Sequence, residues 1–270
     1  NAATLSGLVN GGNGTDVLDY ADYTTTVTVD LSTGSATGIN GNNINGVSNV
    51  ENITGGSAAD SLKGDAGANV ITGNAGNDTL TGLGGDDRYV FADNADTDEV
   101  FEAAGAGSDT LDFSPATVDL HFALSSIHVT GTDIDVTHAA DNVENIIGGT
   151  GTDTLDYSAF ATARDISLTS LGSDDGFAGS ETVTGIAFDN INAIIGSTST
   201  SDSLTTLDAI STFNLQPSTV EYISTNTLTL SGIETIIGGN ANDTLTFASF
   251  STARDIQVDA VGTVDGFDIT

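Results

Sequence analysis

The sequence predicts an all-β fold, a parallel β-solenoid (β-roll or β-helix) built from alternating repeat units of roughly 45 residues. Three observations lead to this prediction. Asp-x-Leu motifs that follow a turn-forming stretch recur at spacings of 44, 49, 44, 49 and 41 residues. No long segment has the apolar period of a helix. Only 2 prolines occur in 270 residues, so a ladder of strand hydrogen bonds is almost uninterrupted.

Two kinds of unit, A and B, alternate along the chain. A units close on the related motifs VENITGG, VENIIGG and IETIIGG, and two B units share the stretch that begins with Asp-Thr-Leu and contains Thr-Ala-Arg-Asp. Stacked units of this size are typical of solenoids. We divide the single continuous array 1–270 into a lead-in turn at 1–15, unit A1 at 16–59, unit B1 at 60–108, unit A2 at 109–152, unit B2 at 153–201, unit A3 at 202–242 and a partial unit B3 at 243–270.

Strand signals fill these units. The stretches TTVTVDLS (25–32) and ARDISLTS (163–170) alternate apolar and polar residues, and Gly, Asn and Asp supply the turns between strands. A β-sandwich would also give short strands, but it would use larger aromatic core residues than the 6% aromatic content offers. A narrow core of Leu, Ile and Val with small residues at the corners favours the solenoid.

Four consecutive nonapeptides occupy 55–63, 64–72, 73–81 and 82–90. In each, six residues turn the chain and three form a strand whose middle residue should point inward. Glycines at the first and fourth positions permit backbone conformations that a Cβ would forbid, so that their carbonyls can face a common centre. The inward residues are Leu62, Ile71, Leu80 and Tyr89, and the first-position glycines are Gly55, Gly64, Gly73 and Gly82.

The sixth position of each nonapeptide supplies a side-chain oxygen. Two nonapeptides make one coil, so every second loop should stack on the same edge, about 4.8 Å apart. Asp60 then lies above Asp78, and Asn69 above Asp87. Unpaired carboxylates at this distance repel, whereas a Ca²⁺ ion with oxygen ligands would hold them together. The alternative is that these residues only shape the turns.

The run at 55–90 resembles the repeats-in-toxin (RTX) calcium-binding nonapeptide, G-G-x-G-x-D-x-U-x, and the A and B modules resemble those of large secreted bacterial RTX exoproteins and adhesin-like proteins. The resemblance implies a parallel β-roll, Ca²⁺ as cofactor, folding after export and a type I-like secretion route. The departures are Ala58, Asp65 and the uncharged Asn69. We therefore expect the Asn69/Asp87 cage to bind more weakly than the Asp60/Asp78 cage.

Single copies of the nonapeptide occur at 11–19, 148–156 and 238–246. If each unit makes two coils, these loops lie two layers apart and cannot share one ion. Their acids therefore either cap turns or contribute to further metal sites. The weaker metal candidates are these three acids, Asp16, Asp153 and Asp243, together with Asp109, which opens unit A2.

The charge balance restricts the partners of the chain. Its 38 acidic residues against 4 basic ones give a formal net charge of −34, which repels nucleic acid and anionic membranes. No stretch approaches the length of a membrane span, and without Cys there is no disulfide framework. Cations are the partners that would neutralise this self-repulsion. We expect no nucleic-acid partner and no membrane insertion.

The sequence offers no catalytic constellation. His121, His128 and His138 lie in one A unit on alternating sequence, as surface residues rather than as a transition-metal site. Arg164 and Arg254 occupy the same place in two B units, where each would form a structural ion pair. The acidic pair at 174–175 is interpreted as part of a solvated turn.

Together these features predict a non-enzymatic, calcium-binding structural segment of a secreted or cell-surface bacterial fibre, which becomes rigid when it meets extracellular Ca²⁺. Exposed strand edges at the ends of the solenoid could pair head to tail and give a filament. The alternatives are the stalk of an adhesin with a separate tip domain, or the RTX region of a secreted lyase, epimerase or protease. The absence of Met, and an end inside unit B3, lead us to expect a segment of a longer array.

Overall fold

Short strands of two to seven residues, joined by turns, form nearly all of the regular structure. The structure, a computed structural model, describes residues 5–94, 96–102, 107–125, 128–132, 134–138 and 143–250. Within these ranges the only helical element is the 3₁₀ turn η1 (Asn40–Asn42), so none of the described residues forms a helix able to cross a bilayer. The described residues form two compact units, one of residues 5–118 with 128–146 and one of 119–125 with 147–250.

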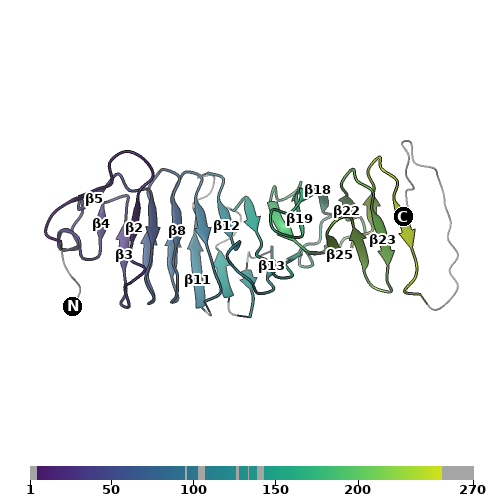
Figure 1. Cartoon of the computed structure of the whole chain (residues 1–270), viewed down its shortest axis with the longest axis horizontal. Helices are drawn as coiled ribbons and strands as arrows, with labels where there is room; N and C mark the ends of the chain where they lie inside the picture. Colours follow the sequence, from purple (N-terminus) through teal and green to yellow (C-terminus); the bar gives the residue numbers. More distant parts are fainter. Residues whose placement is uncertain are drawn as a thin grey trace. The chain divides into compact units, whose positions relative to one another are not determined.

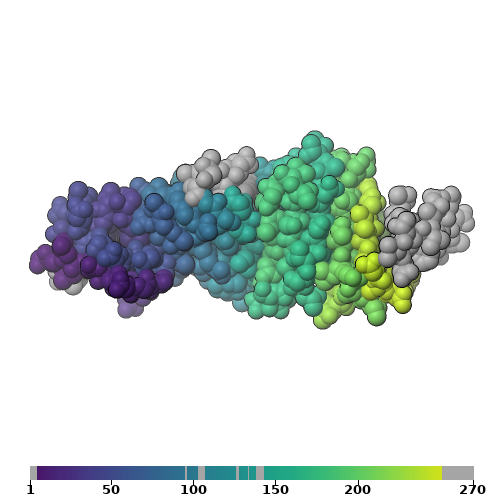
Figure 2. All heavy atoms as spheres, turned by 90° about the horizontal axis from the view of Figure 1, so that it is seen from above, coloured from purple at the N-terminus to yellow at the C-terminus, as the bar shows by residue number. Residues whose placement is uncertain are grey.

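In the first unit, successive coils of the chain each contribute one strand to each of two parallel sheets (Figure 1). Four further strands belong to this unit: β4 is antiparallel to β3 at the edge of its sheet, β14 is antiparallel to β15, and β1 and β5 pair in a separate two-stranded sheet. Figure 2 shows the coils of this unit side by side in sequence order, from purple to teal. One sheet contains β2 (Val17–Asp19), β6 (Asn52–Thr54), β8 (Val70–Thr72), β10 (Arg88–Val90) and β12 (Thr110–Asp112). The other contains β3 (Thr28–Asp30), β7 (Ser61–Lys63), β9 (Thr79–Thr81), β11 (Asp96–Phe101) and β15 (Ile134–His138). The four further strands are β1 (Val9–Asn10), β4 (Ser35–Ala36), β5 (Val47–Ser48) and β14 (His128–Thr130), and β16 (Asn145–Ile147) follows at the end of the unit in sequence.

The register of these sheets follows the nonapeptides. Leu62 pairs with Leu80 in one sheet and Ile71 with Tyr89 in the other, so every second nonapeptide stacks as predicted. All four side chains are at most 1% exposed, which confirms that the middle residue of each strand forms the core. Burying an aliphatic side chain of this size stabilises the fold by roughly 1.5–3 kcal/mol. The narrow core is therefore built from one inward residue per strand.

The second unit combines parallel ladders with antiparallel strands that the sequence did not predict. Its turn between β18 and β19 closes with a hydrogen bond from the Gly172 N–H to the Gly176 carbonyl, and Gly176 has a φ of 52°. This tight turn reverses the chain before a coil is complete, so β18, β19 and β20 run antiparallel. A second antiparallel group is β23, β24 and β25. The strands of this unit are β13 (His121–Ala123), β17 (Thr154–Asp156), β18 (Asp165–Leu171), β19 (Phe177–Glu181), β20 (Ala187–Ile191), β21 (Ala193–Ile195), β22 (Ser203–Thr205), β23 (Thr212–Leu215), β24 (Val220–Ile223), β25 (Thr227–Ser231), β26 (Thr235–Ile237) and β27 (Thr244–Thr246).

Parallel ladders of stacked coils connect β13, β17, β21 and β25, and likewise β18, β22 and β26. The chain is thus an all-β solenoid, as predicted, with antiparallel excursions in its second unit. The division into alternating A and B units stays a prediction, and most of unit B3, with Arg254, lies outside the described residues.

Candidate metal centre

An acidic side chain stands directly before many of the short parallel strands and binds the coil stacked on it. In the sheet of β7 and β9, Oδ1 of Asp60 accepts a hydrogen bond from the Val27 N–H at 2.7 Å. Oδ1 of Asp78 accepts one from the Asp60 N–H at 2.7 Å, and Oδ1 of Asp98 accepts one from the Asp78 N–H at 2.9 Å. We call Asp60, Asp78 and Asp98 the Asp60 column. Each carboxylate therefore caps a main-chain donor that the ladder leaves open.

The same arrangement lies before the strands of the other sheet. The Asn69 N–H donates to Oδ1 of Asp87 at 2.7 Å, and the Asp87 N–H donates to Oδ1 of Asp109 at 2.8 Å. Glutamates continue the series, because the N–H groups of Asp16 and Asp109 each donate to a glutamate carboxylate at 2.8 Å. The Asp87 column consists of Asp16, Glu51, Asn69, Asp87, Asp109 and Glu144.

The side chain five residues after the first-position glycine of each nonapeptide leaves no room for a Cβ on that glycine. A Cβ on Gly55 would lie 2.6 Å from Oδ2 of Asp60 and 2.5 Å from the Gly73 carbonyl oxygen of the next coil. Positive φ angles fall instead on the fourth-position glycines Gly76 and Gly85, at 113° and 103°. The first-position glycine thus leaves a space in which a carboxylate and a main-chain carbonyl from successive coils face each other.

The same convergence recurs at the other first-position glycines. A Cβ on Gly64 would meet Oδ1 of Asn69 and, at 2.9 Å, the Gly82 carbonyl oxygen. A Cβ on Gly73 would meet Oδ2 of Asp78. Side-chain oxygens and glycine carbonyls of alternate loops therefore gather along both edges, and their role as metal ligands stays a prediction.

The second carboxylate oxygens are buried and poorly satisfied. Asp78 and Asp87 are 2% and 1% exposed, and Oδ2 of each is buried without a hydrogen-bond partner. Oδ2 of Asp60 accepts a hydrogen bond from the Gly56 N–H at 2.6 Å. An ionised oxygen buried without a donor is costly, since it has lost its hydration. A cation at these points would remove that cost.

Burial raises the pKa of these carboxyl groups. It raises the pKa of Asp78 to about 8, and the charges of Asp98 and Asp60 add to the effect, although the hydrogen bond from the Asp60 N–H opposes it. Burial likewise raises the pKa of Asp87 to about 7 and that of Asp98 to about 6. Near neutral pH each column therefore holds acids that favour either a proton or a metal ion.

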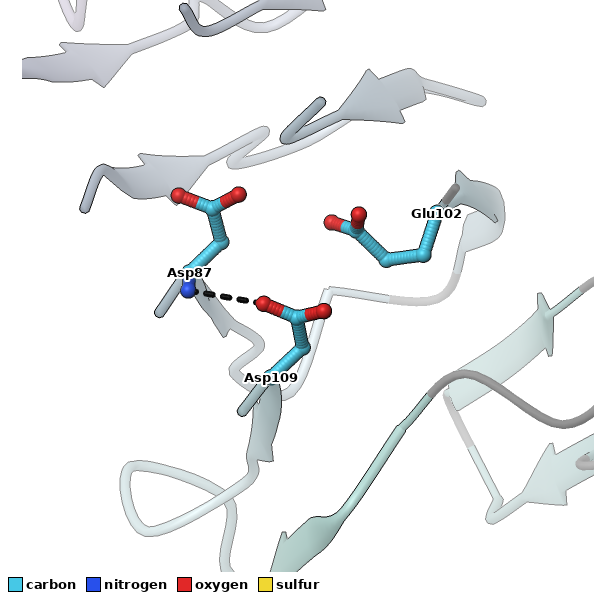
Figure 3. A group of neighbouring side chains, drawn as sticks. All are labelled: Asp87, Glu102 and Asp109. Carbon is cyan, nitrogen blue, oxygen red and sulfur yellow. Dashed lines mark hydrogen bonds between the residues drawn. The ribbon is translucent and has the colours of Figure 1, made fainter. Parts of the chain in front are cut away.

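Three carboxylates converge at the end of the nonapeptide run (Figure 3). Ligand oxygens of Asp87, Glu102 and Asp109 all lie within 4.8 Å of one another, and Asp87 and Asp109 are buried. Glu102 comes from the segment just after β11, outside the nonapeptides, and it also contacts the Tyr89 hydroxyl. A Cβ on Gly82 would meet oxygens of both Asp87 and Glu102, so the glycine keeps this space open.

The donor set fits Ca²⁺. A calcium ion takes 6–8 oxygen ligands at about 2.3–2.6 Å and accepts carboxylates and main-chain carbonyls alike. The columns supply both kinds of donor, and three of their carboxylates, those of Asp16, Asp78 and Asp87, carry a buried oxygen without a partner. The residues that would hold ions are Asp60, Asp78 and Gly73 in one pair of loops, Asn69, Asp87 and Gly82 in the other, and Glu102 and Asp109 beyond the run.

The acids of two of the isolated copies, Asp153 and Asp243, also cap main-chain donors. Oδ1 of Asp153 accepts from the Leu120 N–H, and Oδ1 of Asp243 accepts from the Ser211 N–H, each at 3.0 Å. Oδ2 of Asp16 and of Asp153 is buried without a partner. Asp109 is brought together with Asp87, which makes it a member of the three-carboxylate cluster. At Asp153 the capping of a main-chain donor and a buried oxygen without a partner coexist, so capping does not exclude a metal there.

Sequence reasoning missed Asp98, Glu102 and the glutamates of the closing motifs. The glutamates follow the same local rule as the nonapeptide acids, an acid two residues before a buried aliphatic residue, as in Glu51-Asn52-Ile53. That triplet was a signal available in the sequence. Glu102 had none, because it reaches the cluster from a segment outside the repeat pattern.

The remaining charged motifs have structural partners. Arg164 is 3% exposed, lies 3.6 Å from Glu181 and stacks 3.8 Å above the Phe160 ring, which agrees with the predicted ion pair. His121 and His128 pair with aspartates at 3.0 and 2.7 Å on partly exposed strands. Both histidines therefore have surface partners.

Comparison with known families agrees with this geometry. Residues 54–89 and 229–246 match the family model described as the RTX calcium-binding nonapeptide repeat (4 copies). No curated protein matches the chain. Residues 54–89 and 229–246 therefore carry RTX-type calcium-binding repeats, and the cofactor of these repeats is Ca²⁺.

Proposed function

We propose that the chain is a non-enzymatic structural segment of a secreted or cell-surface bacterial fibre, and that it folds and becomes rigid when it meets extracellular Ca²⁺. The observation that carries this proposal is the two columns of stacked acids, in which buried carboxylate oxygens of Asp78 and Asp87 have no hydrogen-bond partner. A polypeptide that buries such groups gains most from folding when a cation is present.

The energetic reasoning depends on the calcium concentration. A net charge of −34 opposes compaction in a compartment with very little free Ca²⁺, which would keep the chain unfolded and competent for export by a type I-like route. Extracellular calcium modules bind at about 10⁻⁴–10⁻³ M. An ion at a hundredfold excess over its Kd stabilises the folded state by about 2.7 kcal/mol per site. A few such sites would reverse the balance.

A fibre role is favoured over catalysis by what the described residues are used for. The buried acids cap main-chain donors of neighbouring coils, as Asp78 does for Asp60, and the buried Arg164 forms an ion pair. These side chains therefore hold the coils together. Head-to-tail pairing of solenoid ends would extend such a segment into a filament. An adhesin stalk or the RTX region of a secreted enzyme would use the same calcium chemistry.

The test is circular dichroism of the purified chain during titration with EGTA and then with Ca²⁺. We expect EGTA to abolish most of the β-sheet signal at pH 7.5 and added Ca²⁺ to restore it, with Mg²⁺ at equal concentration as the ionic-strength control. A spectrum and melting temperature that ignore Ca²⁺ would refute the proposal. Sedimentation velocity with and without Ca²⁺ then tests self-association.

A further inference from the structure

A second kind of metal site is suggested by the loop at 148–156 and the hairpin turn at 172–176, both in the second unit. The loop is a single nonapeptide copy and lies outside the residues that match the repeat family. With no second nonapeptide beside it, the loop cannot form a cage of the kind described above. The question is whether another part of the unit supplies the missing acid.

Asp153 provides the first observation. It is 0% exposed, its Oδ1 caps the Leu120 N–H, and its Oδ2 is buried without a hydrogen-bond partner of normal geometry, although the Gly149 amide lies close to the carboxylate. A Cβ on Gly148 would meet that Oδ2 and would lie 2.6 Å from the Asn190 carbonyl oxygen. A free carboxylate oxygen and a main-chain carbonyl therefore face the same space.

Asp175 provides the second observation. It lies in the turn between β18 and β19, and its Oδ1 is also buried without a partner. Its Oδ2 accepts a hydrogen bond from Nδ2 of Asn192 at 3.2 Å, while Oδ1 of Asn192 accepts one from the Asp153 N–H at 3.0 Å. Asn192 thus links the two acids and holds them in one neighbourhood.

The pKa shifts of Asp153 and Asp175 agree with two acids placed close together in a buried environment. Burial raises the pKa of Asp153 to about 7, and the charges of Asp175 and Asp119 add to the rise. Burial also raises the pKa of Asp175. The sequence had placed Asp175 in a merely solvated turn, whereas the structure gives it a buried oxygen next to a second acid. Two buried anions in this arrangement repel unless a cation lies between them.

We propose that Asp153, Asp175 and the Asn190 carbonyl form a Ca²⁺ site. In this site the hairpin turn at 172–176 takes the place of the second nonapeptide. Carboxylate and carbonyl oxygens are the hard donors that Ca²⁺ prefers, and waters can complete its coordination. The site would fasten the β18–β19 turn to the coil that carries β17. It needs no ion in the run at 55–90, so it is independent of the function proposed above.

The test compares the full chain with the variants Asp175→Asn and Asp174→Asn. Asp174 is exposed and adjacent, so its variant has the same change in charge without touching the site. Calorimetric titration with Ca²⁺ gives the number and affinity of sites, and hydrogen exchange with mass spectrometry follows peptides that cover 172–176 and 55–90. We expect Asp175→Asn to lose one site, or to weaken it at least tenfold, and Asp174→Asn to bind as the wild type does.

Hydrogen exchange separates the two proposals. In the wild type, Ca²⁺ should slow exchange at 172–176, and Asp175→Asn should lose this protection while 55–90 keeps its response. Unchanged stoichiometry and affinity in Asp175→Asn would overturn the site, as would exchange at 172–176 that ignores Ca²⁺. A response at 172–176 without one at 55–90 would support this site and count against the nonapeptide mechanism. Asp153→Asn, which keeps an acceptor for the Leu120 N–H, should reproduce the loss.

Discussion

Without Ca²⁺, the fold should become more stable as the pH falls from 8 to 5, the reverse of ordinary acid denaturation. Burial raises the pKa of Asp78 to about 8 and that of Asp87 to about 7, against 3.8 for an ordinary aspartate. A group with a higher pKa in the folded state favours folding in its protonated form. Its contribution is fully present below the unfolded pKa and is lost as the pH rises through the folded pKa.

The expected magnitude is large relative to the stability of a domain. Each unit of difference between the folded and unfolded pKa corresponds to about 1.4 kcal/mol, so the raised pKa values of Asp78 and Asp87 each cost the metal-free fold on the order of 4 kcal/mol at pH 7, relative to a pH below both pKa values. A whole domain is stable by only about 5–15 kcal/mol. Protonation of these two groups should therefore raise the melting temperature by at least about 10 °C.

The assay is circular dichroism of the Ca²⁺-free chain at pH 8, 7, 6 and 5, in which the β-sheet signal that is lost near pH 7.5 should return as the pH falls and should then melt at rising temperature. With saturating Ca²⁺ the trend should weaken or reverse, because the ion binds the ionised carboxylates and competes with protons. The double variant Asp78→Asn, Asp87→Asn should lose most of the pH dependence. Its control, Asp22→Asn with Glu99→Gln, changes the same charge at exposed positions and should keep the dependence.

The reasoning would be refuted by a metal-free melting temperature that is flat or falls between pH 8 and pH 5. It would also be refuted if both double variants flattened the dependence equally. In that case the general reduction of negative charge, rather than the buried carboxylates, would govern the stability of the metal-free chain.

Three further changes test individual contacts. Asp78→Ala should weaken Ca²⁺ binding at least tenfold and more than Asn69→Ala, since only Asp78 brings a charge; calorimetric titration of both measures this, and equal losses would contradict the pairing of alternate loops. Gly82→Ala should abolish Ca²⁺-induced folding, because its Cβ would meet the Asp87 and Glu102 carboxylates, whereas Gly7→Ala, with open space around it, should fold normally in the same circular dichroism assay. Arg164→Met should cost about 3 kcal/mol in urea unfolding with or without Ca²⁺, since it breaks a buried ion pair rather than a metal site, and a purely Ca²⁺-dependent effect would contradict this.

Local periodicity was sufficient to predict the coils. One inward residue per nonapeptide and the 18-residue register follow from spacing alone, and the pairing of Leu62 with Leu80 agrees. The antiparallel strands after Gly172 could not be predicted in this way, because a single tight turn decides whether the chain completes a coil or reverses. Glu102 and Asp175 were equally hidden, since each reaches its acidic neighbour from a segment without repeat spacing. A functional site that depends on such contacts can therefore be recognised only once the three-dimensional fold is known.

The glutamates explain how units with different loops stack in one solenoid. The backbone N–H groups of Asp16, Asp109 and Asp202, which open the predicted A units, donate to the carboxylates of glutamates 32–35 residues later. In the nonapeptides an aspartate performs the same capping 18 residues later. The recurring element of these coils is therefore a side-chain oxygen that accepts the N–H of the coil stacked on it, not a fixed repeat length. Long excursions fit between coils where the chain returns with an acid, or with an amide such as Asn192, two residues before its next buried aliphatic side chain.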